Sequence, residues 1–294
     1  MNCKEKKGGS AMKYQAVFKR YELKYLITRE QKEAVLTAMS PYMSLDEYGK
    51  STIRNIYFDT DDFILARHSI AKPDFKEKLR IRSYKKADER SEVFVELKRK
   101  CDHIVYKRRI ALPEEDAMKW VEGDRSSFIE GECRAASSQV TEEIEYFCSL
   151  YPGLRPTVYL SYDREAYKMN DSSDFRVTFD SNIRSRDYDI SLESDAYGSE
   201  LLDEDKVLME LKCSGGIPLW MTEVLSKGRM YKTSFSKYGT AYQTQIFPVI
   251  SAEAIAKRSI RQATENMEKQ MEKQEEQKWR IYSQGFMTAQ LFHR

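Results

Sequence analysis

The chain has 294 residues, of which 33% are charged and 41% hydrophobic, and its 49 Lys and Arg residues nearly balance 47 Asp and Glu residues. This length and composition are typical of a soluble globular protein with one large domain or two small ones. A net charge of only +2 gives no reason to expect a nucleic-acid partner.

Several common kinds of segment and site are not indicated. No apolar run approaches the roughly 20 residues that span a bilayer, and the first 14 residues lack the apolar stretch of a secretory signal, so we expect a flexible leader over 1–14. The five cysteines are scattered without a CxxC spacing, which favours a reducing, cytoplasmic location. Three isolated histidines argue against a His-based metal site or a catalytic triad.

The spacing of apolar residues predicts strands with helices between them. In chain order we predict a strand at 16–27, a helix at 28–39, strands at 52–59, 75–84, 92–100 and 103–112, helices at 113–123 and 137–151, strands at 156–167, 174–181 and 206–213, and helices at 218–228 and 234–246. Because this order has no strict βαβ rhythm, we expect an α+β protein built on an antiparallel sheet or barrel.

The C-terminal part of the chain differs in composition. From Ile250 to about Gln284 it is rich in Lys, Glu, Gln and Met, which is typical of one long polar helix. We therefore divide the chain into the leader, a domain over 15–248 and a helix over 249–294. The thin apolar stripe on this helix fits either a solvated helix docked on the domain or a helix that binds a protein partner.

The predicted strands separate charged from apolar side chains. Successive side chains of a strand point to opposite faces, so residues two apart share a face. The charged faces hold Arg20, Glu22 and Lys24; Lys78, Arg80 and Arg82; Glu96, Lys98 and Lys100; Tyr162 and Arg164; Arg176 and Asp180; and Glu210 and Lys212. In the strand at 103–112, a bulge would decide whether Lys107 or Arg108 joins them.

Two explanations fit this alternation. In an ordinary antiparallel sheet one face is exposed to solvent, and charged side chains on that face need no ligand. However, many Lys and Arg residues on neighbouring strands repel one another unless an anion lies among them. The apolar faces would also suit covering helices. We therefore expect an eight-stranded antiparallel β-barrel with a charged interior and helices packed outside.

A charged interior of this kind suits linked phosphates and a divalent metal. Guanidinium groups match phosphate oxygens in pairs, and lysines add point charges. The carboxylates Glu22, Glu96, Asp180 and Glu210 are candidate ligands for Mn²⁺ or Mg²⁺, which take oxygen ligands and bridge phosphates. For Glu22 and Glu96, an ion pair with the Lys two residues further on is an equally good explanation.

The ordered set of motifs resembles the VTC domain, the polyphosphate polymerase module of the triphosphate tunnel metalloenzyme (CYTH-like) superfamily. The motifs are RYELKY (20–25), IYFDT (56–60), KLRIRSY (78–84), VELKRK (95–100), YDREAY (162–167), FRVTFD (175–180), MELK (209–212) and FSKY (235–238). Each motif alone is weak, whereas their order over roughly 16–246 is specific. The chain resembles a stand-alone bacterial type without the SPX domain or transmembrane segments of eukaryotic members.

The resemblance implies a triphosphate-binding tunnel and metal-dependent transfer of the ATP γ-phosphate onto a polyphosphate chain. It implies catalytic contacts from Lys24, Arg80, Arg82, Lys98, Arg164, Arg176 and Lys237, a metal on Glu210, and phosphate or substrate contacts from Lys107 or Arg108, Tyr162 and Ser236. To the substrate contacts we add Arg20, Lys78, Lys100 and Lys212 from the charged faces. At Lys100, eukaryotic VTC domains tend to have a histidine.

Other functions stay open at this level. The same residues would serve a triphosphatase that uses water as the acceptor, and a non-catalytic module would bind polyphosphate without turnover. The expected ligands are ATP, triphosphate and polyphosphate, and the product made from ATP would separate these alternatives.

Overall fold

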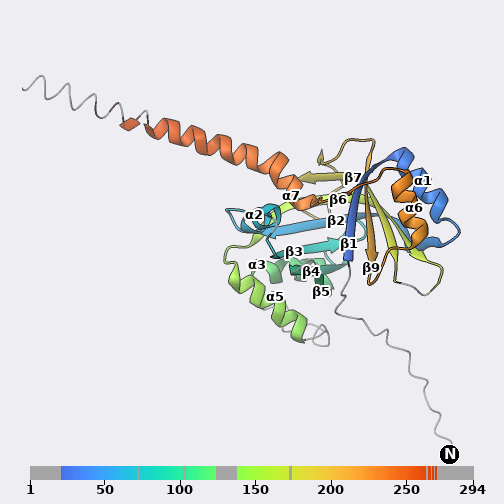
Figure 1. Cartoon of the computed structure of the whole chain (residues 1–294). Coiled ribbons are helices and arrows are strands. Elements are labelled where there is room, and N and C mark those ends of the chain that lie inside the picture. The colour runs from blue at the N-terminus through green and yellow to red at the C-terminus, as the bar shows by residue number, and fades with distance from the viewer. Residues whose placement is uncertain are drawn as a thin grey trace, which may run out of the picture. The chain divides into compact units, whose positions relative to one another are not determined.

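The computed structural model describes residues 21–71, 73–101, 104–123, 138–171 and 174–262, together with 264, 265, 267 and 269. The chain divides into two compact units, Met1–Tyr242 and Gln243–Arg294. The first unit is an α+β structure built on one large antiparallel sheet (Figure 1). The predicted leader over 1–14 lies outside the described residues.

The sheet has ten strands in the order β10-β1-β9-β7-β6-β2-β3-β4-β5, with β8 paired to β7. The strands are β1 (Tyr21–Thr28), β2 (Met43–Asp59), β3 (Phe75–Ser83), β4 (Glu92–Cys101), β5 (Ile104–Pro113), β6 (Arg155–Met169), β7 (Arg176–Arg186), β8 (Ser199–Glu200), β9 (Lys206–Cys213) and β10 (Lys232–Thr233). Across the described ranges no backbone pairing joins β5 to β10, so the sheet is not closed and the expected eight-stranded barrel is not confirmed.

Except for α2, which was not predicted, the helices lie within the ranges that the sequence indicates. They are α1 (Arg29–Met39), α2 (Ile64–Ala71), α3 (Glu114–Glu122), α5 (Ser138–Leu150), α6 (Leu219–Lys227) and α7 (Lys237–Ala241), followed by the π-helical turn η2 (Tyr242–Ile246). Thr28 caps α1, because its side chain accepts from the Gln31 backbone N–H and the Gln31 side chain accepts from the Thr28 N–H. Gly123 ends α3 with a φ of 107°, a conformation that favours glycine.

One core cluster lies under α1 and α6. It buries Val35 and Met39 of α1 and Met221 of α6 against Val177 of β7 and Leu211 of β9. These helices therefore cover the apolar face of the β1-β9-β7 side of the sheet.

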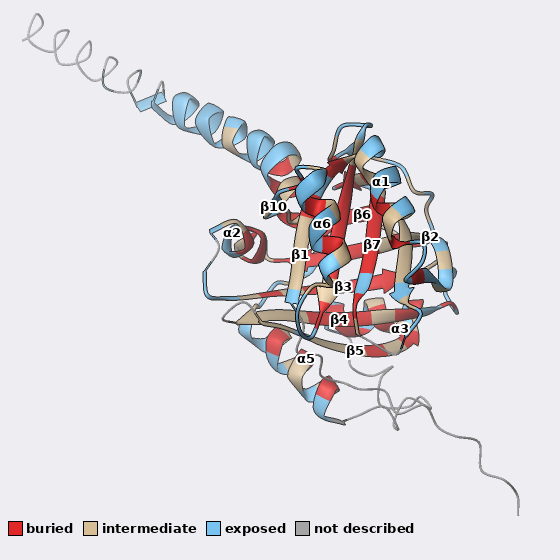
Figure 2. Ribbon diagram, turned by 45° about the vertical axis from the view of Figure 1, so that its right-hand side comes forward, coloured by how far each residue is buried: buried red, intermediate tan, exposed pale blue. Residues whose placement is uncertain are grey.

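A second core cluster lies under α3 and α5. Trp120 of α3 and Ile144 and Phe147 of α5 pack against Ile81 of β3 and Leu97 of β4. In Figure 2, β3 and β4 carry buried stretches, and the ribbon of α5 has both buried and exposed stretches. Because side chains alternate along a strand, the charged residues between these apolar ones lie on the face turned away from the helices.

The second unit contains a helix over 247–262, which is the described part of the predicted C-terminal helix. Within the portion of the chain that the structure describes, no helix is both long enough and apolar enough to cross a membrane.

Candidate functional site

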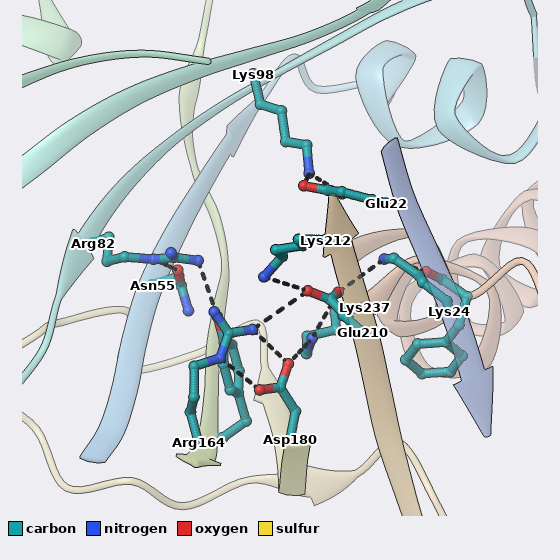
Figure 3. A network of polar contacts seen from close by, with 12 residues as sticks. Glu22, Lys24, Asn55, Arg82, Lys98, Arg164, Asp180, Glu210, Lys212 and Lys237 are labelled. Carbon is teal, nitrogen blue, oxygen red and sulfur yellow. Dashed lines mark hydrogen bonds and ion pairs between the residues drawn. The ribbon is translucent and has the colours of Figure 1, made fainter. Parts of the chain in front are cut away.

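The charged face of the sheet gathers nine cationic side chains around four carboxylates, a group we call the cationic cluster. Figure 3 shows the part of the cluster around Glu22, Asp180 and Glu210. The cations are Lys24, Lys78, Arg80, Arg82, Lys98, Lys107, Arg164, Lys212 and Lys237, and the carboxylates are Glu22, Glu96, Asp180 and Glu210. With every group ionised, the cluster has an excess of five positive charges. Because burial disfavours unbalanced charge, an anion would stabilise this arrangement.

Asp180 on β7 is one negative centre of the cluster. Arg164 on β6 donates from Nε and Nη2 to the two Asp180 oxygens at 2.6 and 2.7 Å, and Lys237 donates to Oδ2 at 2.5 Å. Burial acts to raise the pKa of Asp180, but Arg164 and Lys237 together lower it. The carboxyl group is therefore an anion that holds two cations in place.

Glu210 on β9 contacts four cations at longer distances. Its oxygens lie 3.0 Å from Lys212 Nζ, 3.3 Å from Lys24 Nζ, 3.7 Å from Arg164 Nη2 and 3.9 Å from Lys237 Nζ. Burial opposes ionisation, but these cations hold the pKa of Glu210 well below its usual range. Glu210 is thus charged, and no single partner binds it in a bidentate pair.

Glu96 on β4 is enclosed by three cations and has no exposed surface. Its Oε2 accepts from Arg80 at 2.9 and 2.7 Å and lies 3.8 Å from Arg82, while Oε1 contacts Lys107. Burial would raise the pKa of Glu96, but Arg82, Lys107 and Arg80 keep it well below its usual range. Burial in turn lowers the pKa of Lys107 to about 7. These contacts orient two guanidinium groups and leave little room for a metal ion at Glu96.

Tyr162 lies between Arg82 on one side and Lys237 and Arg164 on the other. Its hydroxyl oxygen accepts from Arg82 Nη2 at 2.9 Å, and its ring lies 4.4 Å from Lys237 Nζ and 5.1 Å from the Arg164 guanidinium carbon. Burial acts to raise the pKa of Tyr162, but Arg164, Arg82 and Lys237 lower it overall. The ring and hydroxyl therefore fix the spacing between the arginines.

An ion pair between Glu22 and Lys98 spans the open side of the sheet. The Lys98 Nζ donates to both Glu22 oxygens at 3.0 and 2.8 Å, although β1 and β4 are not neighbours in the strand order. Burial opposes ionisation of Glu22, but Lys98 lowers the pKa of Glu22 to about 2. The sheet thus curls until side chains from both of its ends meet around the cluster.

The remaining predicted residues lie at the rim of the cluster or away from it. Arg176 is exposed and pairs in register with Lys212, and Lys100 is half-buried on the same face as Lys98. Arg108 points to the opposite face, where its Nε lies 2.9 Å from Glu143 of α5, so Lys107 is the residue that joins the cluster. Arg20 lies outside the described residues.

Several supporting residues were not predicted. Asn55 Oδ1 accepts from Arg82 Nε at 2.9 Å, and the Tyr57 hydroxyl accepts from Arg80 Nη1 at 2.9 Å. The Tyr57 ring stacks on Tyr238 with centroids 4.6 Å apart, and Tyr238 donates to Asp59 at 2.6 Å. These residues could have been identified from the sequence, because Asn55, Tyr57 and Asp59 are two residues apart in the strand and therefore share a face.

Glu210 is the carboxylate that best fits a divalent metal, because none of its cations lies closer than 3.0 Å, and Asp180 lies near it. Both lie within 3.7 Å of one Arg164 nitrogen, so their hard oxygen ligands are close together. In the described stretches of the chain no three metal-ligating side chains come together. A Mg²⁺ or Mn²⁺ ion would therefore need phosphate oxygens or water to complete its coordination, which is common for Mg²⁺.

The fold and the cluster define a protein that concentrates positive charge on one face of a curled antiparallel sheet. A sequence model of the VTC domain matches residues 19–246, and the chain belongs to the VTC-domain family. This membership supports an enzyme that acts on triphosphate groups. No curated protein sequence matches the chain.

Solved structures show distant likenesses. A protein assigned as an adenylate cyclase from Bacillus halodurans is 17% identical, with a TM-score of 0.47 over 76% of this chain and 96% of its own. A Hippeastrum protein, assigned as an adenylyl cyclase with a dominant triphosphatase activity, is 12% identical, with a TM-score of 0.44 over 76% and 94% of the two chains. TM-scores this low support no inference about activity.

Proposed function

We propose that the protein is a polyphosphate polymerase that moves the γ-phosphate of ATP onto the terminal phosphate of a polyphosphate chain. The observation that carries the proposal is the excess of cations over carboxylates in the cationic cluster. Linked phosphates carry closely spaced negative charges that would balance this excess. In this proposal the eight longer strands act as a tunnel, and the Glu22–Lys98 ion pair holds its open side together.

The cluster suits phosphoryl transfer because this reaction depends mainly on position and on neutralising charge. Glu96, Tyr57 and Asn55 hold Arg80 and Arg82 in fixed orientations before any substrate arrives. Preorganised guanidinium groups pair with two phosphate oxygens each at a low entropic cost. Arg164 and Lys237, held by Asp180, would supply a second group of contacts.

A divalent metal belongs to the same proposal. Glu210, with Asp180 nearby, would hold Mn²⁺ or Mg²⁺ together with phosphate oxygens. Such an ion would draw negative charge from the transferred phosphoryl group. Glu22 and Glu96 are less suited, because each is already held by cations at short distances.

The low basicity of the four carboxylates favours transfer to a phosphate acceptor over hydrolysis. Each of the four carboxylates in the cluster is paired with at least one cation, and their lowered pKa values make them weak bases. A water nucleophile would benefit from a general base. A terminal phosphate oxygen is already anionic and needs none.

The test is to incubate the protein with ATP and Mn²⁺ and to separate polyphosphate chains on a gel. We expect chains that lengthen with time, and none with the Glu210→Gln variant. If orthophosphate is the only product, the protein is a triphosphatase and not a polymerase. Tight binding of tripolyphosphate without any product would show that the protein is a non-catalytic binding module. Affinity no greater than that of an Arg80→Met/Arg164→Met double variant would refute a phosphate site altogether.

A further inference from the structure

Lys78 differs from the other cations of the cluster in its partners. Among the described residues, each of the other eight cations has a carboxylate oxygen within 3.8 Å, and Lys78 has none. Its Nζ instead donates to the Ser236 hydroxyl at 2.8 Å, and that hydroxyl already accepts from the Gly239 N–H to cap α7. A half-buried amine is therefore held by a neutral group.

The surroundings of Lys78 are cationic on several sides. The groups that face it are Lys76 and Arg80 on its own strand, Lys98 in register on β4, Lys24 on β1 and the Tyr238 ring of α7, which lies 5.9 Å from Nζ. On the neighbouring strand β2, Asp59 accepts hydrogen bonds from the Tyr238 hydroxyl and from backbone N–H groups of α2. Burial, followed by the charges of Lys24 and Lys98, holds the pKa of Lys78 well below its ordinary value.

We propose that Lys78 couples anion binding to the uptake of a proton. Phosphate oxygens that enter the cluster supply the counter-charge that Lys78 lacks, and its lone pair then takes a proton from solvent to form the ammonium group. This inference rests on the proposed binding of triphosphate. The affinity for triphosphate should therefore depend on pH. For each proton taken up on binding, the affinity falls by up to about tenfold for every unit by which the pH rises.

The experiment measures proton uptake by calorimetry. Inorganic tripolyphosphate is titrated into the protein without metal, at a series of pH values from neutral up to the ordinary pKa of lysine, each in two buffers with different heats of ionisation. The difference in heat gives the protons taken up per ligand bound. Lys107 and Lys212 also have lowered pKa values, so the informative quantity is the difference between variants.

Two substitutions of Lys78 isolate its part. Lys78→Met should lower affinity and remove about one proton from the uptake. Lys78→Arg should bind within a few-fold of the wild type and also lose that proton, because guanidinium stays charged. Lys227→Met on α6, where the side chain is 81% exposed, is the matched control and should change neither quantity.

Thermal unfolding gives an independent readout. In the empty protein, at a pH between the lowered pKa of Lys78 and its ordinary value, the unfolded state binds more protons at Lys78 than the folded state, which costs stability. Lys78→Met should therefore raise the unfolding midpoint of the empty protein, whereas a lysine that only supports the structure would lower it on removal. Unchanged proton uptake in both Lys78 variants would overturn this inference alone, and absence of binding by the wild type would overturn the proposed function as well.

Discussion

Glu96→Gln tests whether carboxylates hold the cationic cluster together. The side chain has no exposed surface, and the substitution keeps its shape while removing the charge that faces Arg80, Arg82 and Lys107. Removing one partner of a buried ion pair costs about 3–5 kcal/mol. For a unit of this size the unfolding midpoint should fall by about 6–20 °C. Thermal unfolding followed by circular dichroism measures the fall.

The same variant should be rescued by the ligand. Tripolyphosphate would return negative charge to the three cations, so it should raise the midpoint of Glu96→Gln by more than it raises that of the wild type. Glu77→Gln is the matched control, because Glu77 is equally buried but pairs with Arg99 on the outer face, beside α5. Both variants should lose stability, and the ligand should raise the midpoint of Glu96→Gln by more than that of Glu77→Gln. Equal ligand-induced shifts in the two variants would refute the reasoning.

Three further predictions follow from the contacts of the cluster. Glu210→Gln should reduce Mn²⁺-dependent turnover by at least about 100-fold, while calorimetry without metal should show tripolyphosphate binding at least as tight as in the wild type. Lys107→Met should weaken that binding and Arg108→Met should not, since only Lys107 joins the cluster; equal losses would contradict the assignment. Glu22 has a pKa of about 2 when folded and 4.5 ordinarily, so its stabilising effect is present above pH 4.5 and disappears as the pH falls towards 2. Urea unfolding should therefore show a smaller acid-induced loss in Glu22→Gln than in the wild type.

The charged face could be predicted because side-chain direction in a strand is a local property. Leu79 and Leu97 lie in the core, and their neighbours Lys78, Arg80 and Lys98 lie in the cluster, as parity requires. Helices α1 and α3, which are bounded by Thr28 and by Gly123, were predicted almost to the residue. Helix α2 was not predicted, because its cap comes from Asp59, whose oxygens accept from Leu65 and Ala66 N–H groups six and seven residues away.

The pairing of charges could not be predicted, because it depends on how the sheet curls. An ion pair with Lys24, two residues further on, was one of two explanations for Glu22, and metal binding was the other. The partner of Glu22 is Lys98, 76 residues away, and Lys24 pairs with Glu210 instead. Closure of a barrel depends on pairing between the two edge strands of the sheet, which the alternation of side chains along a strand does not predict. The observed pairing leaves the sheet open.

The tripeptide Glu-Leu-Lys occurs on β1, β4 and β9, and its three glutamates have different surroundings. Glu22 meets one lysine across the open side of the sheet, and Glu96 is enclosed by three cations. Glu210 touches four cations, none closer than 3.0 Å. Longer contacts cost less to break when phosphates compete for the same lysines. Glu210 is therefore the copy best able to release its partners and turn to a metal ion, whereas Glu96 stays bound to its arginines.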